Sequence, residues 1–244
     1  INDIVKILNF HSDNYKNKIF FKKDILIPRK TSELFKKSII FQGQDFIILN
    51  KWSSIATQGG SKINISIDDI IKNISSDYRL VHRLDKNTSG LLIVAKNLNT
   101  AKIFGKLFKS SLVHKTYIAL CEGQPKQKES KVLLDIKNKE DKIENTKTKY
   151  KLLDVQNNIS LIQYKPLTGK THQLRIVSKN LGCSIIGDNK YNSYSKFKNE
   201  ILKLNAYNLK FKFNDKNYEF FSDIPKDFYF FLKKYKFKNL KKYI

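Results

Sequence analysis

The stretch that decides the fold is Val81-His82-Arg83-Leu84-Asp85-Lys86-Asn87-Thr88-Ser89-Gly90-Leu91-Leu92-Ile93-Val94-Ala95-Lys96. It places one carboxylate, Asp85, between two basic residues in a turn, and an apolar run of strand length follows. Loops held by a rigid strand often carry catalytic residues. A structural Arg–Asp ion pair at the entrance of a strand would have the same spacing. From spacing alone the two interpretations are equally supported.

The motif resembles a known family. His82-Arg83-Leu84-Asp85-x-x-Thr88-Ser89-Gly90-Leu91-Leu92 is similar to the signature of the RluA-type pseudouridine synthases, which isomerise selected uridines in structured RNA. The resemblance implies that Asp85 is the catalytic carboxylate and that Arg83 handles the RNA. We expect His82 to be structural.

Three further blocks follow in the family's order. Lys115-x-Tyr117-x-Ala119 resembles a strand whose tyrosine lines the active site. Thr168-Gly169-Lys170-Thr171-His172-Gln173-Leu174-Arg175 resembles a turn and helix start, with Lys170 in place of the family's arginine. There Arg175 matches the arginine that pairs with the catalytic aspartate. Gly187-Asp188-x-x-Tyr191 matches the family's Gly-Asp-x-x-Tyr segment.

Two positions depart from the family pattern. The family's first block ends in Asn-Lys-Pro before a Gly-Gly loop, whereas here Asn50-Lys51 is followed by Trp52, and Gly59-Gly60 remains. Asn205 stands where relatives commonly have histidine. It replaces one hydrogen bond of that histidine but not its charge, and we expect small consequences.

Composition indicates a polyanion partner. The 244 residues carry a formal net charge of +25, which predicts affinity for nucleic acid that falls steeply with salt. The abundance of Lys, Asn and Ile is also typical of an AT-rich genome, so lysine drift explains part of the charge. Cys121 and Cys183 have no metal-ligand spacing and read as reduced core residues of a cytosolic protein. No apolar run is long enough for a membrane span.

The sequence predicts two parts, divided after residue 37. Residues 1–7 resemble the last strand of an S4-type RNA-binding domain, so residues 1–37 are expected to hold the end of such a domain plus a linker with short strands. Residues 38–244 are expected to form the catalytic domain. The chain begins without Met, which suggests a fragment or a processed chain.

Periodicity predicts individual elements. Residues 39–51 read as two strands around a glycine turn, residues 67–74 as a helix, and residues 101–108 as a helix capped by Asn99 or Thr100. Residues 124–147 read as a solvated hairpin or loop. Two strands joined by Asn157-Asn158 and a basic amphipathic helix within 224–244 complete the chain.

The resemblance, rather than these patterns, implies the fold class: α+β, with a long, mixed but mainly antiparallel sheet flanked by helices and a central catalytic cleft. It also implies a reaction that needs no metal, nucleotide or other cofactor. The carboxylate of Asp85 must be ionised at neutral pH, and neighbouring cations favour that form. The sequence does not choose between a nucleophilic and a proton-abstracting role for Asp85.

Further roles come from the same resemblance. Tyr117 is the candidate that removes or relays the C5 proton. The uridine must be flipped out of a stem, with Arg83 filling the space and Leu174 and Tyr117 packing on the base. Basic side chains, among them Lys51, Lys170 and His172, are expected to contact the RNA.

The leading hypothesis is therefore an RluC-like pseudouridine synthase for large-subunit ribosomal RNA, a monomeric cytoplasmic enzyme without a membrane partner. One alternative is a tRNA-directed synthase. A second is a non-catalytic RNA-binding or ribosome-assembly protein, which the retention of Asp85, Tyr117 and Arg175 argues against. A third is nonspecific polyanion binding, which explains the charge but not the ordered blocks.

Overall fold

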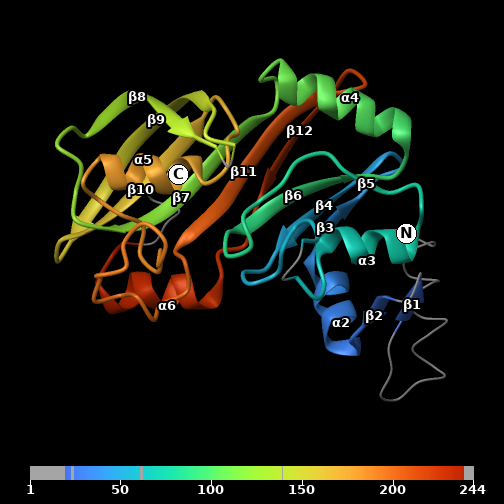
Figure 1. Cartoon of the computed structure of the whole chain (residues 1–244), viewed down its shortest axis with the longest axis horizontal. Coiled ribbons are helices and arrows are strands. Elements are labelled where there is room, and N and C mark those ends of the chain that lie inside the picture. The colour runs from blue at the N-terminus through green and yellow to red at the C-terminus, as the bar shows by residue number, and fades with distance from the viewer. Residues whose placement is uncertain (1–19, 23–24, 61–62, 139, 239–244) are drawn as a thin grey trace. The chain divides into compact units, whose positions relative to one another are not determined.

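The computed structural model describes residues 20–22, 25–60, 63–138 and 140–238 (Figure 1). The chain divides into two compact units. Unit 1 holds the described residues up to Lys86 together with Leu91–Ser110, and unit 2 holds Asn87–Gly90 and the described residues from Ser111 onward. The proposed S4 strand at residues 1–7 lies outside the described residues, so the division after residue 37 stays a prediction.

Unit 1 combines a small sheet with helices. Its elements are β1 (Phe20–Lys22), β2 (Ile25–Ile27), α2 (Arg29–Ser38), β3 (Ile39–Gln42), β4 (Phe46–Lys51), α3 (Ile67–Ile74), β5 (Arg79–Leu80), most of β6 (Ser89–Ala95) and α4 (Leu98–Lys109). In the sheet β4 lies between β3 and β6, and β5 pairs with β6. Every residue of β6 is buried, which explains its continuous apolar run.

Helix α2 corrects the prediction of a linker with short strands before residue 38. The two strands β1 and β2 are present, but Arg29–Ser38 is helical. Its buried positions are Ser32, Phe35 and Ser38. Because two of these three are serines, the buried face has the spacing of a helix but no hydrophobic periodicity.

The other two helices of unit 1 were predicted correctly, with one change at a cap. Ser66 and Asp69 form a capping box at the start of α3. At the start of α4 the cap is Asn97, whose side chain accepts a hydrogen bond from the backbone N–H of Thr100. The prediction of Asn99 or Thr100 as the cap is therefore wrong, because the helix begins two to three residues earlier than the apolar pattern indicates.

Unit 2 is built on a mainly antiparallel sheet. Its elements are the first two residues of β6, then β7 (His114–Glu122), β8 (Glu129–Lys137), β9 (Ile143–Gln156), β10 (Ile159–Pro166), α5 (Gln173–Asn180), β11 (Leu204–Phe213), β12 (Lys216–Phe221) and α6 (Lys226–Lys234). The strand order runs β6-β11-β7-β10-β9-β8, and β12 pairs with β11. The β6–β11 pair is parallel and the others are antiparallel.

The β9–β10 hairpin confirms the predicted turn. Asn157 and Asn158 both have positive φ, 51° and 61°, as a two-residue hairpin turn requires. Residues 124–147 contain β8 and the first residues of β9. These two strands form a hairpin, which is one of the two conformations predicted there.

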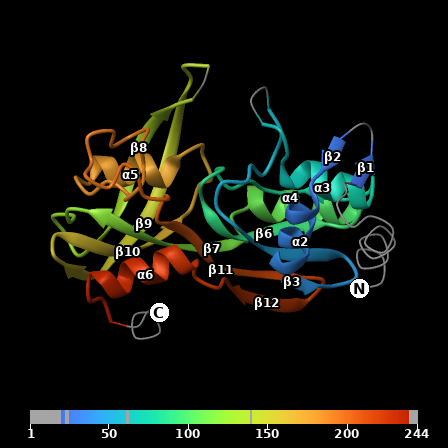
Figure 2. The ribbon, with the colours of Figure 1, turned by 90° about the horizontal axis from the view of Figure 1, so that it is seen from below.

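Helices α5 and α6 cover opposite faces of the unit 2 strands, as Figure 2 shows. Phe228, Phe231 and Leu232 of α6 pack with Leu120 and other residues of one face. Leu174 and Val177 of α5 pack with Ala119 and Ile162 of the other. Side chains alternate along a strand, so neighbouring residues of β7 serve the two different cores. The predicted C-terminal amphipathic helix thus docks on the core. Both cysteines are free and buried, as expected.

The geometry at Gly90 shows why the central motif has glycine at this position. Its φ is +107°, and a Cβ built there would lie 2.3 Å from the backbone oxygen of Ala206. Because Ala206 belongs to β11, which pairs in parallel with the start of β6, any side chain at this position would push the two strands apart.

Candidate active site

Two backbone anchors hold the loop that carries Asp85 in unit 1. The hydroxyl of Thr57 donates to the carbonyl of Leu84 over 2.7 Å and accepts from the N–H of Leu84 over 3.1 Å. On the other side, Nζ of Lys51 donates to the carbonyl of Lys86 over 3.2 Å. The half-buried Asp85 therefore lies between two residues whose main chains are fixed.

Lys51 is the most unusual side chain of unit 1. It is fully buried at 0% exposure, and Nζ also donates to the carbonyls of Trp52 (3.1 Å) and Ile55 (3.0 Å). Burial lowers the pKa of Lys51 to about 7, while the charge of Asp85 opposes this by favouring the ammonium form. An ammonium group has three donors, so the three carbonyls match it completely. Lys51 thus brings a positive charge close to Asp85 at neutral pH and below.

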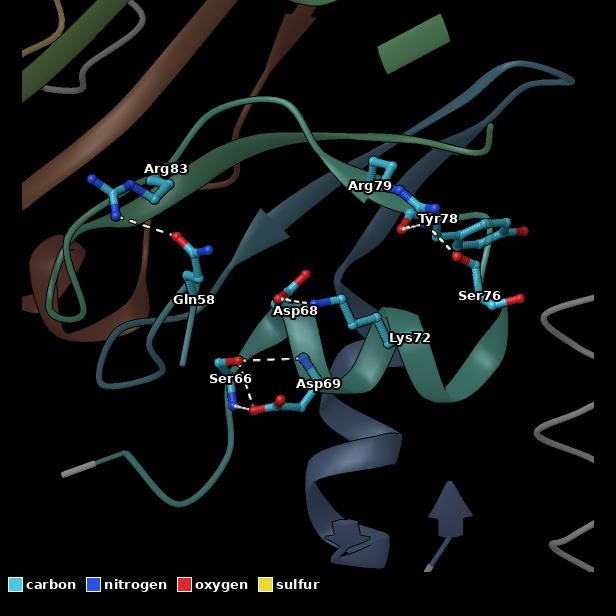
Figure 3. Close-up of polar contacts among 9 residues, drawn as sticks. All are labelled: Gln58, Ser66, Asp68, Asp69, Lys72, Ser76, Tyr78, Arg79 and Arg83. Atoms are coloured by element: carbon cyan, nitrogen blue, oxygen red, sulfur yellow. Dashed lines mark hydrogen bonds and ion pairs between the residues drawn. The ribbon is translucent and has the colours of Figure 1, made fainter. Parts of the chain in front are cut away.

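The contacts of Arg83 and His82 indicate different roles for these two side chains. Arg83 is exposed, and Nη1 donates to the side-chain oxygen of Gln58 over 3.2 Å (Figure 3). An exposed guanidinium with several remaining donors is suited to binding RNA. His82 instead accepts a hydrogen bond at Nε2 from the N–H of Ile93 (2.9 Å) and packs on Phe108 at 4.8 Å between ring centroids. These contacts agree with a structural His82.

In unit 2, Tyr117 and Leu174 share the face covered by α5. Tyr117 is half-buried on β7 and packs against the core cluster that contains Leu174. Leu174 is buried at 7% exposure in the first turn of α5. The structure therefore brings the predicted tyrosine and the predicted leucine to the same side of the sheet.

Arg175 forms a bidentate pair with Asp188. Nε donates to Oδ2 over 2.8 Å and Nη2 to Oδ1 over 2.6 Å. The Asp188 side chain is almost fully buried, and its Oδ1 also accepts from the N–H groups of Lys190 and Tyr191. This arrangement fixes the guanidinium plane of Arg175. The pairing of Arg175 with Asp85 that the family resemblance implies stays a prediction.

Tyr191 is a residue whose role the sequence did not indicate. Its hydroxyl lies 3.0 Å from Nδ1 of His172, and its ring lies 5.1 Å from Cζ of Arg175. His172 itself has a left-handed backbone with φ 56°. The Gly-Asp-x-x-Tyr spacing is the sequence feature that could have indicated this role. Asp188 fixes Arg175, and Tyr191, three residues later, contacts both Arg175 and His172.

The turn before α5 is held by Gln173. Its side-chain oxygen accepts from the hydroxyl of Thr168 and the N–H of Lys170, and its amide donates to the hydroxyl of Thr148. Nζ of Lys170, predicted to contact RNA, forms an ion pair with Glu144 over 3.0 Å. This partly exposed pair is worth about 0–1 kcal/mol, so a phosphate could replace the carboxylate at low cost.

Asn205 has a clear structural role in place of the family's histidine. It is fully buried, its amide donates to the hydroxyl of Ser89 (3.0 Å), and its oxygen accepts from the hydroxyl of Ser222 (2.6 Å). It thereby fastens the start of β6 to β11.

The two units therefore supply distinct chemical groups. Unit 1 provides a half-buried carboxylate, a buried amine and an exposed guanidinium. Unit 2 provides a half-buried phenol, Tyr117, and a guanidinium, Arg175, that is fixed by its pair with Asp188. Within the part of the chain that the structure describes, no group of three His, Cys, Asp or Glu side chains could hold a metal ion. No described helix is long and apolar enough to cross a membrane.

Comparison with known proteins identifies the family. Residues 45–180 match the family described as RNA pseudouridylate synthase. The chain is 40% identical over 199 residues to a "Ribosomal large subunit pseudouridine synthase C" of Rickettsia bellii, covering 73% of this chain and 65% of that protein. It is 34% identical to an "Uncharacterized RNA pseudouridine synthase" of Haemophilus influenzae, covering 84% of this chain and 95% of that protein.

Solved structures support the fold. A human protein titled RNA Pseudouridylate Synthase Domain Containing 4 superposes with a TM-score of 0.76 at 22% identity, over 85% of this chain and 96% of that one. The human protein titled Domain Containing 1 gives a TM-score of 0.66 at 25% identity, over 77% and 83%. The predicted α+β fold and the RluC-like resemblance are both confirmed. On this evidence the chain belongs to the RNA pseudouridylate synthase family.

Proposed function

We propose that this chain is a pseudouridine synthase that isomerises specific uridines in structured RNA, with large-subunit ribosomal RNA as substrate. The chain spans 65% of the length of the Rickettsia bellii relative, whose name supports this substrate. The observation that carries the proposal is the loop of Asp85, which keeps the family motif and is anchored on one side by Thr57 and on the other by Lys51.

The reaction breaks the bond from C1′ of the ribose to N1 of uracil and forms one from C1′ to C5. N1 gains a proton and C5 loses one, so no other reactant is consumed. Asp85 is the group that begins the reaction, either as nucleophile or as base towards the sugar. Tyr117 removes or relays the C5 proton in the last step. Holding Asp85 and Arg175 in fixed positions limits the reorganisation needed during reaction.

Access to the target requires base flipping, which costs a few kcal/mol of unstacking. The exposed Arg83 occupies the vacated position, and Tyr117 and Leu174 pack on the flipped base. Lys51 acts through the Asp85 loop rather than on phosphate, because its amine is fully buried. We propose this role for Lys51 in place of the direct RNA contact that the family resemblance predicts.

We further propose that the enzyme is a monomer and that it acts in the bacterial cytoplasm, where ribosomal RNA is made. Its main competitor is a tRNA-directed synthase. A non-catalytic RNA-binding protein is the other competitor, and the retention of Asp85, Tyr117 and Arg175 argues against it.

The test is tritium release from RNA labelled as [5-³H]uridine. We expect release from large-subunit ribosomal RNA and none from transfer RNA, and the modified position should map to one or a few uridines. Release from transfer RNA alone would favour the tRNA-directed alternative. Binding without release from any RNA would favour the non-catalytic one.

A further inference from the structure

A lysine-rich groove of about 470 Å³ lies on the outer strands of unit 2. It is lined by the exposed lysines Lys131, Lys149, Lys151 and Lys165, together with Ser130 and Gln163. Strand pairing places Lys131 opposite Lys149, and Lys149 opposite Lys165. The three side chains therefore form one row across β8, β9 and β10, with neighbouring strands about 4.8 Å apart. We call Lys131, Lys149 and Lys165 the lysine row.

The lysine row lies on the face of the sheet opposite to α5. Along β10, Ile162 and Tyr164 belong to the core cluster of the α5 face, and Leu161 belongs to the cluster of the α6 face. By alternation Lys165 shares the side of Leu161. Tyr117 and Leu174 are on the α5 face, so the row is separate from the groups proposed for catalysis in unit 2.

Three like charges directly opposite one another oppose the folding of the sheet. The structure nevertheless records no ion pair for these three side chains among the described residues. One acidic residue, Glu129, lines the groove, and it lies opposite Lys151 rather than within the row. Among the described residues, the lysine row is thus a repeated cationic element that has no ion-paired counter-charge.

We propose that the lysine row binds the phosphodiester backbone of a second segment of the substrate RNA. Structured RNA folds back on itself, so a helix that flanks the target can reach a face other than the catalytic one. Lysines on adjacent strands place ammonium groups at intervals that flexible side chains can adjust to successive phosphates. Such contacts position the RNA without reading its sequence. The inference rests on the proposed function for the identity of the polyanion as substrate RNA.

The test replaces all three lysines by glutamine, and the wild-type and variant proteins are titrated with ribosomal RNA fragments at several salt concentrations. Each lost phosphate contact lowers the slope of log affinity against log salt by about 0.7–0.9. We expect the slope to fall by about 2 to 3, which corresponds to an affinity on the order of 50- to 150-fold weaker near 0.15 M salt. The RNA concentration for half-maximal rate should rise, and kcat at saturating RNA should be unchanged.

The matched control removes the same charge from another exposed row, Lys102, Lys106 and Lys109 of α4. Glutamine at those three α4 positions should lower the slope of log affinity against log salt by less than half of the fall expected for the lysine row variant. Arginine at the three positions of the lysine row should restore the wild-type slope. An unchanged slope in the glutamine variant, or an equal fall in the α4 control, would overturn the proposal.

The outcomes separate this inference from the proposed function. If the wild-type protein releases tritium but the lysine row variant keeps its slope, only the second RNA contact is wrong. If the wild-type protein releases none and the slope still falls, the surface binds RNA and the proposed activity is wrong. Thermal unfolding checks the variant's fold, and loss of like-charge repulsion predicts an equal or higher midpoint at low salt.

Discussion

Replacing Lys51 by methionine removes a buried amine while keeping an unbranched apolar side chain as far as the Cε position. In the folded protein burial lowers the pKa of Lys51 to about 7 from 10.5. Between these two values the unfolded chain binds more protons at this group than the folded protein does. The free energy of unfolding that depends on Lys51 therefore rises with pH across this window and is lowest below pH 7.

The size of the effect follows from the two pKa values. Between pH 6 and pH 9 the wild-type protein should gain about 2–3 kcal/mol of stability relative to Lys51→Met. The variant also leaves three backbone carbonyls without their donor, which lowers its stability at every pH. Because one of these carbonyls belongs to Lys86, next to Asp85, we expect kcat to fall as well.

Chemical unfolding at pH 6, 7, 8 and 9, followed by fluorescence, measures the change. Trp52 is the single tryptophan of the chain and adjoins Lys51, so it reports on unit 1. Lys102→Met, at an exposed position of α4, controls for the general loss of one positive charge. A stability difference between wild type and Lys51→Met that stays constant from pH 6 to pH 9 would refute the reasoning, since it would mean that the amine does not titrate in this range.

Three other substitutions test the packing around the candidate site. Gly90→Ala should cost more than about 3 kcal/mol or prevent folding, because the new Cβ meets the backbone of Ala206. The control Gly105→Ala, where a Cβ would have nothing within 4 Å, should raise stability by up to about 1 kcal/mol. Thermal unfolding distinguishes the two variants. Asp188→Asn should cost about 3–5 kcal/mol by leaving the Arg175 guanidinium without its buried partner. Asp215→Asn, which removes an exposed ion pair with Lys212, should be nearly neutral. Equal unfolding midpoints for the two variants would show that the Arg175–Asp188 pair is not structural. Asn205→Ala should cost about 1–3 kcal/mol because Ser89 and Ser222 lose a buried hydrogen-bond partner, and a midpoint equal to wild type would exclude that role.

Local sequence patterns were sufficient to predict the elements in which the periodicity is strong. The helix Ile67–Ile74 and the Asn157-Asn158 turn have the geometry that their residues indicate. Helix Arg29–Ser38 was missed because serines occupy two of its three buried positions. The cap at Asn97 was missed because Asn97, Asn99 and Thr100 are all good cap residues, and the end of β6 decides among them.

The contacts around the candidate site depend on pairings between distant residues. Lys51 is an ordinary lysine in the sequence, and only the arrangement of three carbonyls around it shows that it is buried. The Arg175–Asp188 pair and the lysine row likewise depend on how helix and strands are placed, which no short motif encodes. By contrast, the family blocks alone were enough to predict Asp85 and Tyr117 as site residues, and these roles stay predictions.

The most direct test of the account replaces Asp85 by asparagine and measures tritium release from [5-³H]uridine-labelled ribosomal RNA. Asn keeps the size of the side chain but cannot act as a nucleophile or base. Asp45→Asn, at another half-buried position of unit 1, is the control and should keep wild-type activity. The account predicts that Asp85→Asn binds RNA normally and releases no tritium. Release at the wild-type rate by Asp85→Asn would contradict it.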